Sequence, residues 1–436
     1  MKKISQYNIV VKSEDKNIYF NTLTGVKIGL SNKEHSIIEN EFKNLESFAE
    51  KFPNVFNNFY KSGFIIDNNR NEKEEVLFNK KKAIYLDREY ELFLHPTLDC
   101  NFNCWYCYEE HPKGMMRKDV FDKIQKHIKL MSKNITGLHL SWFGGEPMMY
   151  FNEIIYPMSL YAKDIMSKNG LSFKNSITTN AYYINNNNIN LFKEIDLNNF
   201  QITIDGDKER HDKIRQHYGE PTFELIINNV INICESIKDA FVILRINYDK
   251  QTLKTDPSFL NIIPKEIRNR IKIDLQKVWQ VEKKDTEDSF NDDIIRWKDY
   301  LWQQGFNISY SYLSPNNNYG CYANRYYNAS IDHLGRVYKC TACGYAEKDT
   351  VGELLASGEI QLKKEFEAKW FHKLPIENED CEKCVFLPMC SGYCNKKYYE
   401  YKSKNNGNVC LLNGENLKEQ IIKEYQIFKQ SSNLIK

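Results

Sequence analysis

The stretch Cys-Asn-Phe-Asn-Cys-Trp-Tyr-Cys at residues 100–107 decides how the rest of the chain is interpreted. Its cysteines have the spacing C-x3-C-x2-C, and three thiolates this close together can bind three irons of a [4Fe–4S] cluster. The next cysteine, Cys234, lies far along the chain, so the fourth iron would have no protein ligand nearby. The triplet therefore predicts a cluster with one open iron, where a small molecule can bind and react.

A structural zinc site is the alternative for the same triplet. Zinc sites of this kind are closed by a fourth Cys or His ligand near the others. His95 is available, but it belongs to the apolar run 92–98, for which we predict a strand. A strand that precedes the loop is a poor place for the missing ligand, so the spacing favours iron and sulfur.

Length and charge restrict the class of protein. With 436 residues, the chain is expected to form two to three domains. Its 60 basic and 58 acidic residues give a net charge of +2, which provides no electrostatic surface for nucleic acid or for an anionic membrane. The basic N-terminus is not followed by the apolar core of a signal peptide, and no run approaches the roughly 18 apolar residues of a membrane span. We expect a cytoplasmic protein without a nucleic-acid or membrane partner.

The distribution of the 12 cysteines indicates metal ligands rather than disulfides. A chain without a secretion signal keeps its thiols reduced and available for metals or catalysis. Three cysteines lie at 100–107 and eight lie between 321 and 410. Cys234 stands alone in a segment whose apolar residues recur with a helical period, and we predict a core thiol there.

Residues 1 to about 80 are expected to form a small α+β module. Ser31, followed by Glu34, is a capping box that predicts the start of a helix. A second helix is expected at about 45–60, and the polar run 67–75 is expected to be a linker. Short apolar or alternating runs predict strands at 7–11, 17–20, 26–30 and 63–66.

From about 88 to 310, strands alternate with amphipathic helical segments such as 117–132 and 152–167. This pattern is typical of βα units around a parallel sheet, and six such units predict an α/β fold, a partial (β/α)6 barrel. In such a barrel, functional residues lie at the C-terminal ends of the strands. The predicted strands are 92–98, 138–143, 176–179, 200–204, 242–247 and 271–275.

The second predicted strand runs into Gly144-Gly145-Glu146-Pro147, a GGEP motif. Glycines, which lack Cβ, let the backbone approach a bound ligand closely, and a carboxylate can accept a hydrogen bond from an ammonium group. An ordinary Gly-Gly turn is the alternative. The position of the motif, at a strand end downstream of the triplet, favours ligand binding.

The triplet, with the aromatic Tyr106 just before its last cysteine, and the GGEP motif together resemble the radical S-adenosylmethionine (SAM) enzymes. The resemblance implies that SAM chelates the open iron through its amino and carboxylate groups. One electron from the cluster then cleaves SAM to a 5′-deoxyadenosyl radical. The resemblance also places Tyr106 against the adenine, Glu146 on the SAM ammonium and Arg245 on its carboxylate. The implied SAM-binding residues are Tyr106, Gly144, Gly145, Glu146, Pro147, Thr179, Asn180, Asp205 and Arg245.

Several of these positions also have a purely structural interpretation. Asp205 with Gly206 is equally explained by a turn, and a lone Arg245 in a strand can be half-buried with its stem packed. His211 and Arg215 resemble a recurrent stretch of the family, and a solvated helix start is the alternative for them.

The cysteine-rich tail has the seven-cysteine spacing of the SPASM domain, an extension of one radical SAM subfamily. The stretch 330–340 predicts a hairpin with Gly335 in its turn. The resemblance implies two auxiliary [4Fe–4S] clusters. A zinc ribbon is the alternative, since C-x2-C recurs in zinc sites, but seven or eight cysteines without paired histidines, downstream of an iron–sulfur triplet, favour clusters. The implied ligands are Cys381, Cys384, Cys390 and Cys410 for the outer cluster and Cys321, Cys340 and Cys394 for the inner one. Cys343 is the candidate for its fourth ligand, and without it an open iron there could bind substrate.

These patterns predict three domains. They are a module at 1–80, similar to winged-helix-like leader-binding domains, a radical SAM barrel at 81–310 and a SPASM domain at 311–436. The resemblance implies an oxidoreductase that abstracts hydrogen from a ribosomally made precursor peptide and installs a crosslink or another oxidative modification. The implied cofactors are three [4Fe–4S] clusters and SAM. The implied partners are a precursor peptide with an N-terminal leader and an electron donor such as flavodoxin or ferredoxin.

Two other functions account for part of the sequence. Anaerobic sulfatase maturation, which forms formylglycine, uses an Asp directly after the cysteine that corresponds to Cys340, whereas Thr341 follows it here. An iron–sulfur electron carrier without turnover would not need the GGEP motif. For the N-terminal module, simple packing on the barrel is the alternative to leader binding.

Overall fold

The computed structural model describes residues 1–278, 280, 291–309, 320–390, 392, 394–404, 410, 417, 421–423 and 425–426. The chain forms two compact units, each built from separated segments. Unit 1 contains residues 1–87, 310–326 and 368–436, and unit 2 contains residues 88–309 and 327–367. None of the helices in these described ranges combines the length and the apolar character that a membrane crossing requires.

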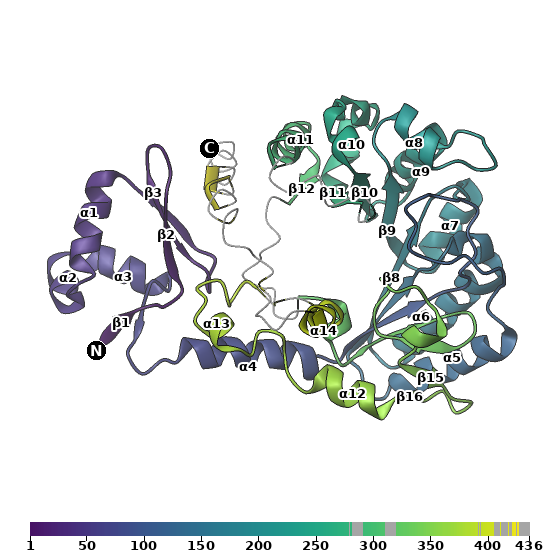
Figure 1. The fold of residues 1–436 in the computed structure, drawn as a ribbon, viewed down its shortest axis with the longest axis horizontal. Coiled ribbons are helices and arrows are strands. Elements are labelled where there is room, and N and C mark those ends of the chain that lie inside the picture. The colour runs from purple at the N-terminus through teal and green to yellow at the C-terminus, as the bar shows by residue number, and fades with distance from the viewer. Residues whose placement is uncertain are drawn as a thin grey trace. The chain divides into compact units, whose positions relative to one another are not determined.

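Unit 2 is built on one large sheet whose central part is parallel (Figure 1). The parallel strands, in spatial order, are β12 (Asn307–Ile308), β11 (Ile271–Lys277), β10 (Phe241–Tyr248), β9 (Leu197–Ile204), β8 (Ser172–Thr179), β7 (Gly137–Trp142), β6 (Glu89–Leu94) and β13 (Asn328–Ile331). The antiparallel strands β14 (Arg336–Tyr338), β15 (Gly352–Leu354) and β16 (Ile360–Leu362) extend the sheet beyond β13. The six predicted strands and their parallel arrangement are confirmed.

The helices that follow these strands cover one face of the sheet. They are α5 (Lys118–Met131), α6 (Tyr156–Lys168), α7 (Asn186–Glu194), α8 (Lys208–Ile214), α9 (Phe223–Ser236), α10 (Lys250–Lys254) and α11 (Asn291–Gln303). Single-turn elements η1 (Pro147–Tyr150) and η2 (Phe151–Ile155) precede α6. Cys234 is fully buried on α9, so the predicted core thiol is confirmed. The strand predicted at 92–98 is too long, because β6 ends at Leu94 and Pro96, which lacks a backbone N–H, cannot continue the ladder.

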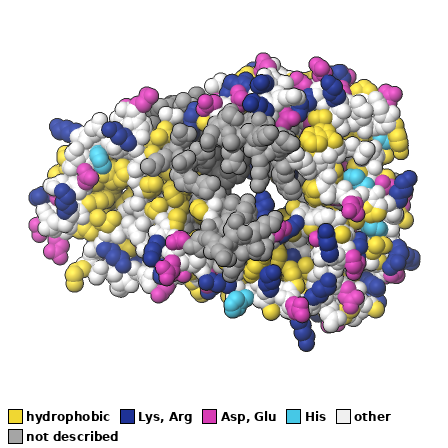
Figure 2. Space-filling model, in the orientation of Figure 1, with side chains coloured by type: hydrophobic (Ala, Val, Ile, Leu, Met, Phe, Trp, Pro, Cys, Tyr) yellow, Lys and Arg dark blue, Asp and Glu magenta, His cyan; other side chains and the backbone are white. Residues whose placement is uncertain are grey.

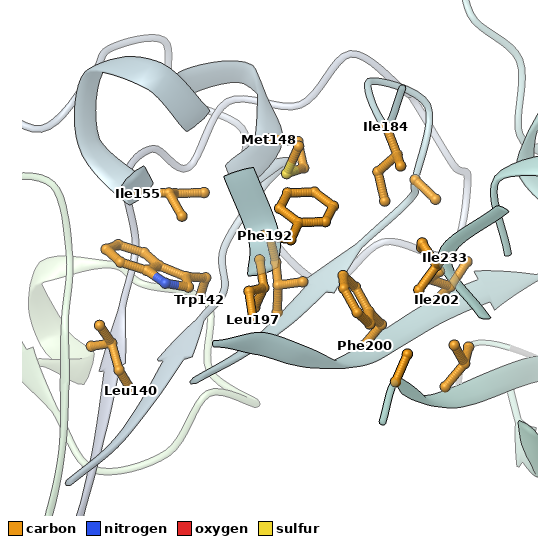
Figure 3. Close-up of a cluster of buried hydrophobic side chains, with 14 of the residues drawn as sticks. Leu140, Trp142, Met148, Ile155, Ile184, Phe192, Leu197, Phe200, Ile202 and Ile233 are labelled. Atoms are coloured by element: carbon orange, nitrogen blue, oxygen red, sulfur yellow. The ribbon is translucent and has the colours of Figure 1, made fainter. Parts of the chain in front are cut away.

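The strands of unit 2 alternate between a buried and a half-exposed face. In β10, Val242, Leu244 and Ile246 are buried, and the intervening residues, among them Arg245 and Asn247, are half-buried. This alternation has the period of two that a strand imposes on its side chains. The buried face joins the helices in one core, in which Phe192 of α7 lies 5.3 Å from Phe151 and 5.6 Å from Phe200, ring centre to ring centre (Figure 3).

Unit 1 begins with a small sheet and three helices. Strands β2 (Asn8–Lys12), β3 (Asn17–Asn21) and β4 (Lys27–Leu30) pair antiparallel, and β1 (Lys2–Ile4) pairs with β5 (Ile65–Asp67). Helices α1 (Asn32–Glu41), α2 (Leu45–Lys51) and α3 (Pro53–Lys61) contribute Ile38, Phe48 and Phe59 to a core that contains Tyr19. The capping box of Ser31 and Glu34 is confirmed. The single helix predicted at 45–60 is wrong, because Pro53, which has no N–H, starts a new helix.

The N-terminal elements share their core with the cysteine-rich tail, within unit 1. Helix α4 (Glu72–Tyr85) contributes Val76 and Ile84 to a core that also contains Tyr7, Leu374, Ile376 and Leu387. The other face of the β2–β4 sheet packs Val11, Ile18 and Phe20 against Met389, Ile421 and Tyr425. The linker predicted at 67–75 is therefore wrong, because Asn71 caps α4 and its polar first turn is helical. The tail adds α12 (Lys364–Phe371), α13 (Glu379–Glu382) and α14 (Asn395–Lys404).

Replacement of Phe192 by alanine tests the core of unit 2. Phe192 is fully buried, so Phe192→Ala should lower the free energy of unfolding by about 3–5 kcal/mol, through lost burial and the cavity that remains. Urea unfolding followed by circular dichroism measures this change. Phe78, which is 62% exposed on α4, is the control, and Phe78→Ala should change stability by about 0.5 kcal/mol or less. Equal effects of the two variants would contradict this assignment of the core.

Candidate functional site

The cysteine triplet forms an irregular loop after β6. Cys100 and Cys104 are half-buried against the core of unit 2, and Cys107 is exposed. Phe102 anchors the loop, because its ring is 4% exposed and lies 5.9 Å from the ring of Tyr182. A buried aromatic inside the loop holds the three sulfurs on a fixed support at the C-terminal end of the first barrel strand.

A recurring backbone turn surrounds the predicted iron ligands. The amide of Phe102 donates to Sγ of Cys100 at 3.4 Å, and the amides of Ala342 and Gly392 donate to Sγ of Cys340 and Cys390, each at 3.3 Å. In every case the donor lies two residues after the cysteine. Such N–H···S bonds stabilise a thiolate and tune a cluster held by it. The donor set, thiols with amide donors at their sulfurs, therefore fits iron–sulfur clusters in all three segments.

In the part of the chain that the structure describes, no three Cys, His, Asp or Glu side chains are arranged to hold a metal ion. Burial, with a further contribution from the Glu146 carboxylate, raises the pKa of Cys100 to about 12. His95, the ligand considered for zinc, is fully buried with its Nε2 2.7 Å from Oγ of Ser330, and burial lowers its pKa to about 3.

The GGEP loop lies directly against the base of the triplet. A Cβ atom on Gly145 would lie 2.0 Å from the carbonyl oxygen of Asp99, and Gly145 has φ +48°, so only glycine fits there. The amide of Glu146 donates to the same Asp99 carbonyl at 2.8 Å. The amide of Gly145 donates to Oε2 of Glu109, which follows the triplet, at 2.9 Å. The GGEP loop is thus attached to both ends of the cysteine loop.

Glu146 joins the ends of two neighbouring strands. Its carboxylate is fully buried and accepts hydrogen bonds from Oγ1 of Thr179 at 2.7 Å and from the Asn180 amide at 2.7 Å. It also accepts from the Met148 amide at 2.9 Å, in the turn that starts with Pro147. Burial raises its pKa, although these donors oppose the increase. The predicted residues Glu146, Thr179 and Asn180 therefore lie together. The hydrogen-bond donors to the Glu146 carboxylate described above are all groups of the protein itself.

Tyr106 connects the cysteine loop to the ends of β9 and β10. Its hydroxyl donates to the Asp205 carboxylate, with both oxygens at 2.7 Å. The same hydroxyl accepts from Arg215 at 2.9 Å and from Nδ2 of Asn247 at 3.1 Å. Arg245 extends this network, since its Nε donates to Oδ1 of Asn247 at 3.0 Å. Tyr106, Asp205 and Arg245 are thus brought into one network, which we call the Tyr106 network together with Arg215 and Asn247.

Burial of charge distinguishes this network from a solvated surface. Asp205 is 1% exposed, and burial raises its pKa, while the guanidinium of Arg215, 3.7 Å away, opposes that increase. His211 is fully buried and Arg215 is 9% exposed, so the alternative of a solvated helix start for this pair is wrong. Asn247 and Glu109 are not among the site residues predicted from the sequence. Asn247 lies two residues after Arg245, on the same face of β10, and this spacing is the signal that could have identified it.

The cysteines of the tail fall in both units. In unit 2, β13 and β14 form the predicted hairpin with Gly335 in its turn, which is confirmed, and Cys340 and Cys343 follow it. Cys343 is 7% exposed in a cluster with Leu98, Tyr338 and Tyr345. In unit 1, a hydrogen bond with Cys321 lowers the pKa of Cys394 to about 6. Burial raises the pKa of Cys381, and the neighbouring thiols of Cys384 and Cys410 add to this increase.

Removal of the Tyr106 hydroxyl should loosen the cysteine loop. Tyr106→Phe takes a donor from a buried carboxylate and an acceptor from Arg215 and Asn247, so we expect a loss of about 1.5–3 kcal/mol in stability. Thermal unfolding of anaerobically reconstituted protein measures it. Tyr156→Phe is the matched control, because the hydroxyl of Tyr156 donates to the Glu194 carboxylate at 2.6 Å on the exposed surface, away from the cysteine loop. A Tyr106→Phe variant as stable as this control would contradict the importance of the network.

Residues 94–256, which contain the triplet, the GGEP motif and the Tyr106 network, match the radical SAM superfamily. The radical SAM cyclopropyl synthase TigE of Paramaledivibacter caminithermalis is 23% identical to the chain, over 98% of this chain and 97% of that protein.

Two groups of solved structures share the fold. The structure described as native anSMEcpe with bound AdoMet and Cp18Cys peptide has a TM-score of 0.59 and 19% identity, over 79% of this chain and 99% of that one. Streptococcus suis SuiB bound to precursor peptide SuiA has a TM-score of 0.52 and 17% identity, over 94% of this chain and 98% of that one. The parallel sheet of unit 2 is thus a radical SAM fold. Residues 94–256 form a radical SAM domain, and the members of this superfamily bind a [4Fe–4S] cluster and SAM.

Proposed function

We propose that this enzyme modifies a ribosomally made precursor peptide, which an N-terminal leader brings to the N-terminal module of unit 1. Abstraction of hydrogen from an unactivated carbon would lead to a crosslink or another oxidative modification. The relatives support a peptide substrate, because a cyclopropyl synthase is similar over nearly the whole chain and the structures of anSMEcpe and SuiB hold peptides. Cytoplasmic residence and reduction by a flavodoxin or ferredoxin remain parts of the proposal.

The observation that carries this proposal is the open edge of strand β4. Within the described residues, β4 pairs with β3 alone, so its other edge has no partner strand. In the β3–β4 pair, the Asn21 amide donates to the Val26 carbonyl. Counting from Val26, every second residue along β4 therefore directs its backbone N–H and C=O groups toward β3. The backbone groups of Lys27 and Gly29 therefore face the open edge. An extended peptide can add to such an edge as a further strand.

Strand β4 and the other N-terminal elements carry apolar side chains. Ile28 and Leu30 of β4 are half-buried and pack toward the aromatic cluster of α1–α3. Figure 2 shows hydrophobic side chains over the N-terminal elements, and the exposed hydrophobic residues of these elements are Ile4, Val10, Ile37, Phe52 and Val55. Main-chain hydrogen bonds would give affinity for the leader, and apolar contacts with alternate side chains would give selectivity.

The bound cluster and SAM supply the radical that removes hydrogen from the target carbon. We assign Cys100, Cys104 and Cys107 to the cluster that binds SAM. The contact between the GGEP loop and Asp99, together with the Tyr106 network, keeps this cysteine loop in one position relative to four strand ends. Two auxiliary clusters would accept the surplus electron of the product radical. Their proposed ligands are Cys381, Cys384, Cys390 and Cys410 for the outer cluster, and Cys321, Cys340, Cys343 and Cys394 for the inner one.

Sulfatase maturation is the second candidate, and the residue after Cys340 disfavours it. Thr341 is 7% exposed, and its carbonyl accepts hydrogen bonds from the hydroxyls of Tyr345 at 2.8 Å and Tyr108 at 3.3 Å. A threonine has no carboxylate to act as the base that this reaction requires in the subfamily. An Asp introduced as Thr341→Asp, tested with a sulfatase-derived peptide, separates the two candidates.

Iron content and SAM cleavage test the assignment of the clusters. Anaerobically reconstituted protein should carry about twelve irons, four for each cluster. Joint replacement of Cys100, Cys104 and Cys107 by alanine should lower this content by about four and abolish formation of 5′-deoxyadenosine, measured by mass spectrometry. Continued formation of 5′-deoxyadenosine in this variant would refute the role of the triplet. An iron content near four in the folded wild-type protein would refute the auxiliary clusters.

A pair of proline variants tests leader binding at β4. Lys27→Pro removes an amide that faces the open edge of β4 and leaves the ladder to β3 intact. Lys12→Pro is the matched control, because the alternation of backbone groups in the β2–β3 pair makes the Lys12 amide face the other open edge of the sheet, that of β2. With the precursor peptide encoded beside the gene, Lys27→Pro should weaken binding at least tenfold in fluorescence anisotropy, while basal SAM cleavage stays unchanged. Equal peptide affinity in wild type and Lys27→Pro would contradict docking at this edge.

Point variants are preferable to removal of residues 1–80. Tyr7, Val76 and Ile18 of this segment complete cores that also contain residues of the cysteine-rich tail, such as Leu387 and Met389. A truncated chain would expose those apolar side chains to water. Loss of activity after truncation would therefore report on folding of the tail as well as on leader binding.

A further inference from the structure

Lys80 occupies an unusual position on helix α4. It is 1% exposed, on the helix face that packs against the segment around the outer cysteines. Val76 and Ile84, one turn away on either side, belong to the apolar core that includes Leu374 and Leu387. A buried charge is costly unless another group compensates it, and an apolar residue of similar length would fill this position at lower cost. The ammonium therefore needs a physical reason.

The contacts of Lys80 connect it to the cysteine loop of unit 1. Its Nζ donates to the carbonyl of Pro388 at 3.2 Å, and Pro388 lies between Cys384 and Cys390. Burial lowers the pKa of Lys80 to about 8, while the nearby Cys390 thiolate favours the charged ammonium. Burial raises the pKa of Cys390, and Lys80 in turn acts against that increase. Lys80 thus places a buried basic side chain against the loop that carries a proposed cluster ligand.

Other cations of α4 have acidic partners in the same segment. Lys73 lies 3.3 Å from Glu382 and Lys81 lies 2.6 Å from Glu377, and all four side chains are at least partly exposed. For Lys80, in contrast, the anion that favours its charge is the Cys390 thiolate. The buried lysine therefore has an electrostatic complement in the proposed cluster ligand, and its ammonium contacts the loop that carries this ligand.

We propose that Lys80 is the buried counter-cation of the outer auxiliary cluster and raises the reduction potential of that cluster. This inference rests on the proposed function, which assigns Cys381, Cys384, Cys390 and Cys410 as ligands. A cluster held by four thiolates is negatively charged, and reduction adds one further negative charge. A nearby buried cation stabilises the reduced state more than the oxidised state, because the Coulomb interaction is strong where water is excluded. A higher potential suits a cluster that takes up one electron from a product radical.

A potentiometric titration followed by electron paramagnetic resonance tests the proposal on the full-length reconstituted protein. The variants are Lys80→Met, which removes the charge, Lys80→Gln, which removes the charge and keeps an amide donor for Pro388, and Lys80→Arg, which keeps the charge. Lys82→Met is the matched control, because Lys82 is exposed on the same helix. Each variant is also made with Cys100, Cys104 and Cys107 replaced by alanine, so that only the auxiliary clusters titrate. Comparison with Cys381→Ala identifies the signal of the outer cluster.

We expect the iron content to be unchanged and the midpoint potential of the outer cluster to become more negative in Lys80→Met and Lys80→Gln. Lys80→Arg and Lys82→Met should keep the wild-type potential, and the inner cluster should not shift in any variant. An unchanged potential in either neutral variant would overturn the proposal. Loss of the outer cluster in both neutral variants would assign Lys80 to folding of the loop instead and would also overturn it. Absence of the outer cluster from the wild-type protein would refute the proposed function as well, so the two failures are distinguishable.

Discussion

The contact between the Asp99 carbonyl and the Gly145 backbone is the constraint on which the site depends. No side chain fits between these two segments, so the cysteine loop and the GGEP loop approach at backbone distance. Glu109 and the Glu146 amide reinforce the contact from the two ends of the cysteine loop. Because β6 and β7 are paired neighbours, the contact attaches the irregular cysteine loop to the parallel sheet of unit 2. Buried hydrogen bonds then extend this rigidity to β8 through Glu146 and to β9 and β10 through Tyr106.

The parts of this site that were predicted from sequence are those with fixed local spacing. Cysteines three and four residues apart, and a glycine pair at a strand end, keep their meaning whatever surrounds them. The resemblance to the family also implied Thr179 and Asn180, which follow a neighbouring strand and hydrogen-bond Glu146. Arg215 and Asn247 contact Tyr106 across more than a hundred residues of sequence, and only the folded chain shows that contact. The polar run around Asn71 predicts a linker, although a helix begins there. Acidic residues in the first turn of a helix have the same composition as a polar connection, so composition does not distinguish the two.

The sheet of unit 2 continues beyond the domain boundary predicted between residues 310 and 311. Strand β13, which follows Tyr327, pairs parallel with β6 and shares its core through Ile331. The hairpin before Cys340 is therefore continuous with the barrel sheet, and His127 of α5 binds the Gly358 carbonyl near β15 at 2.7 Å. Composition and cysteine count predict that the hairpin and the strands after it form a domain separate from the barrel. Hydrogen bonds nevertheless connect these segments to the barrel sheet and to α5. Burial of a shared core, which depends on contacts distant in sequence, decides between the two descriptions.

The shared cores of unit 1 have a consequence for the order in which the chain acquires its structure on the ribosome. Translation produces β2, β3 and α4 first. Leu374, Leu387, Met389 and Ile421 are made only after the segments of unit 2. Until then, the apolar faces of the small sheet and of α4 remain exposed to water, and unit 2 can fold before they are buried. The nascent N-terminal segment therefore exposes apolar surface of the kind that chaperones bind for as long as these tail residues have not been made.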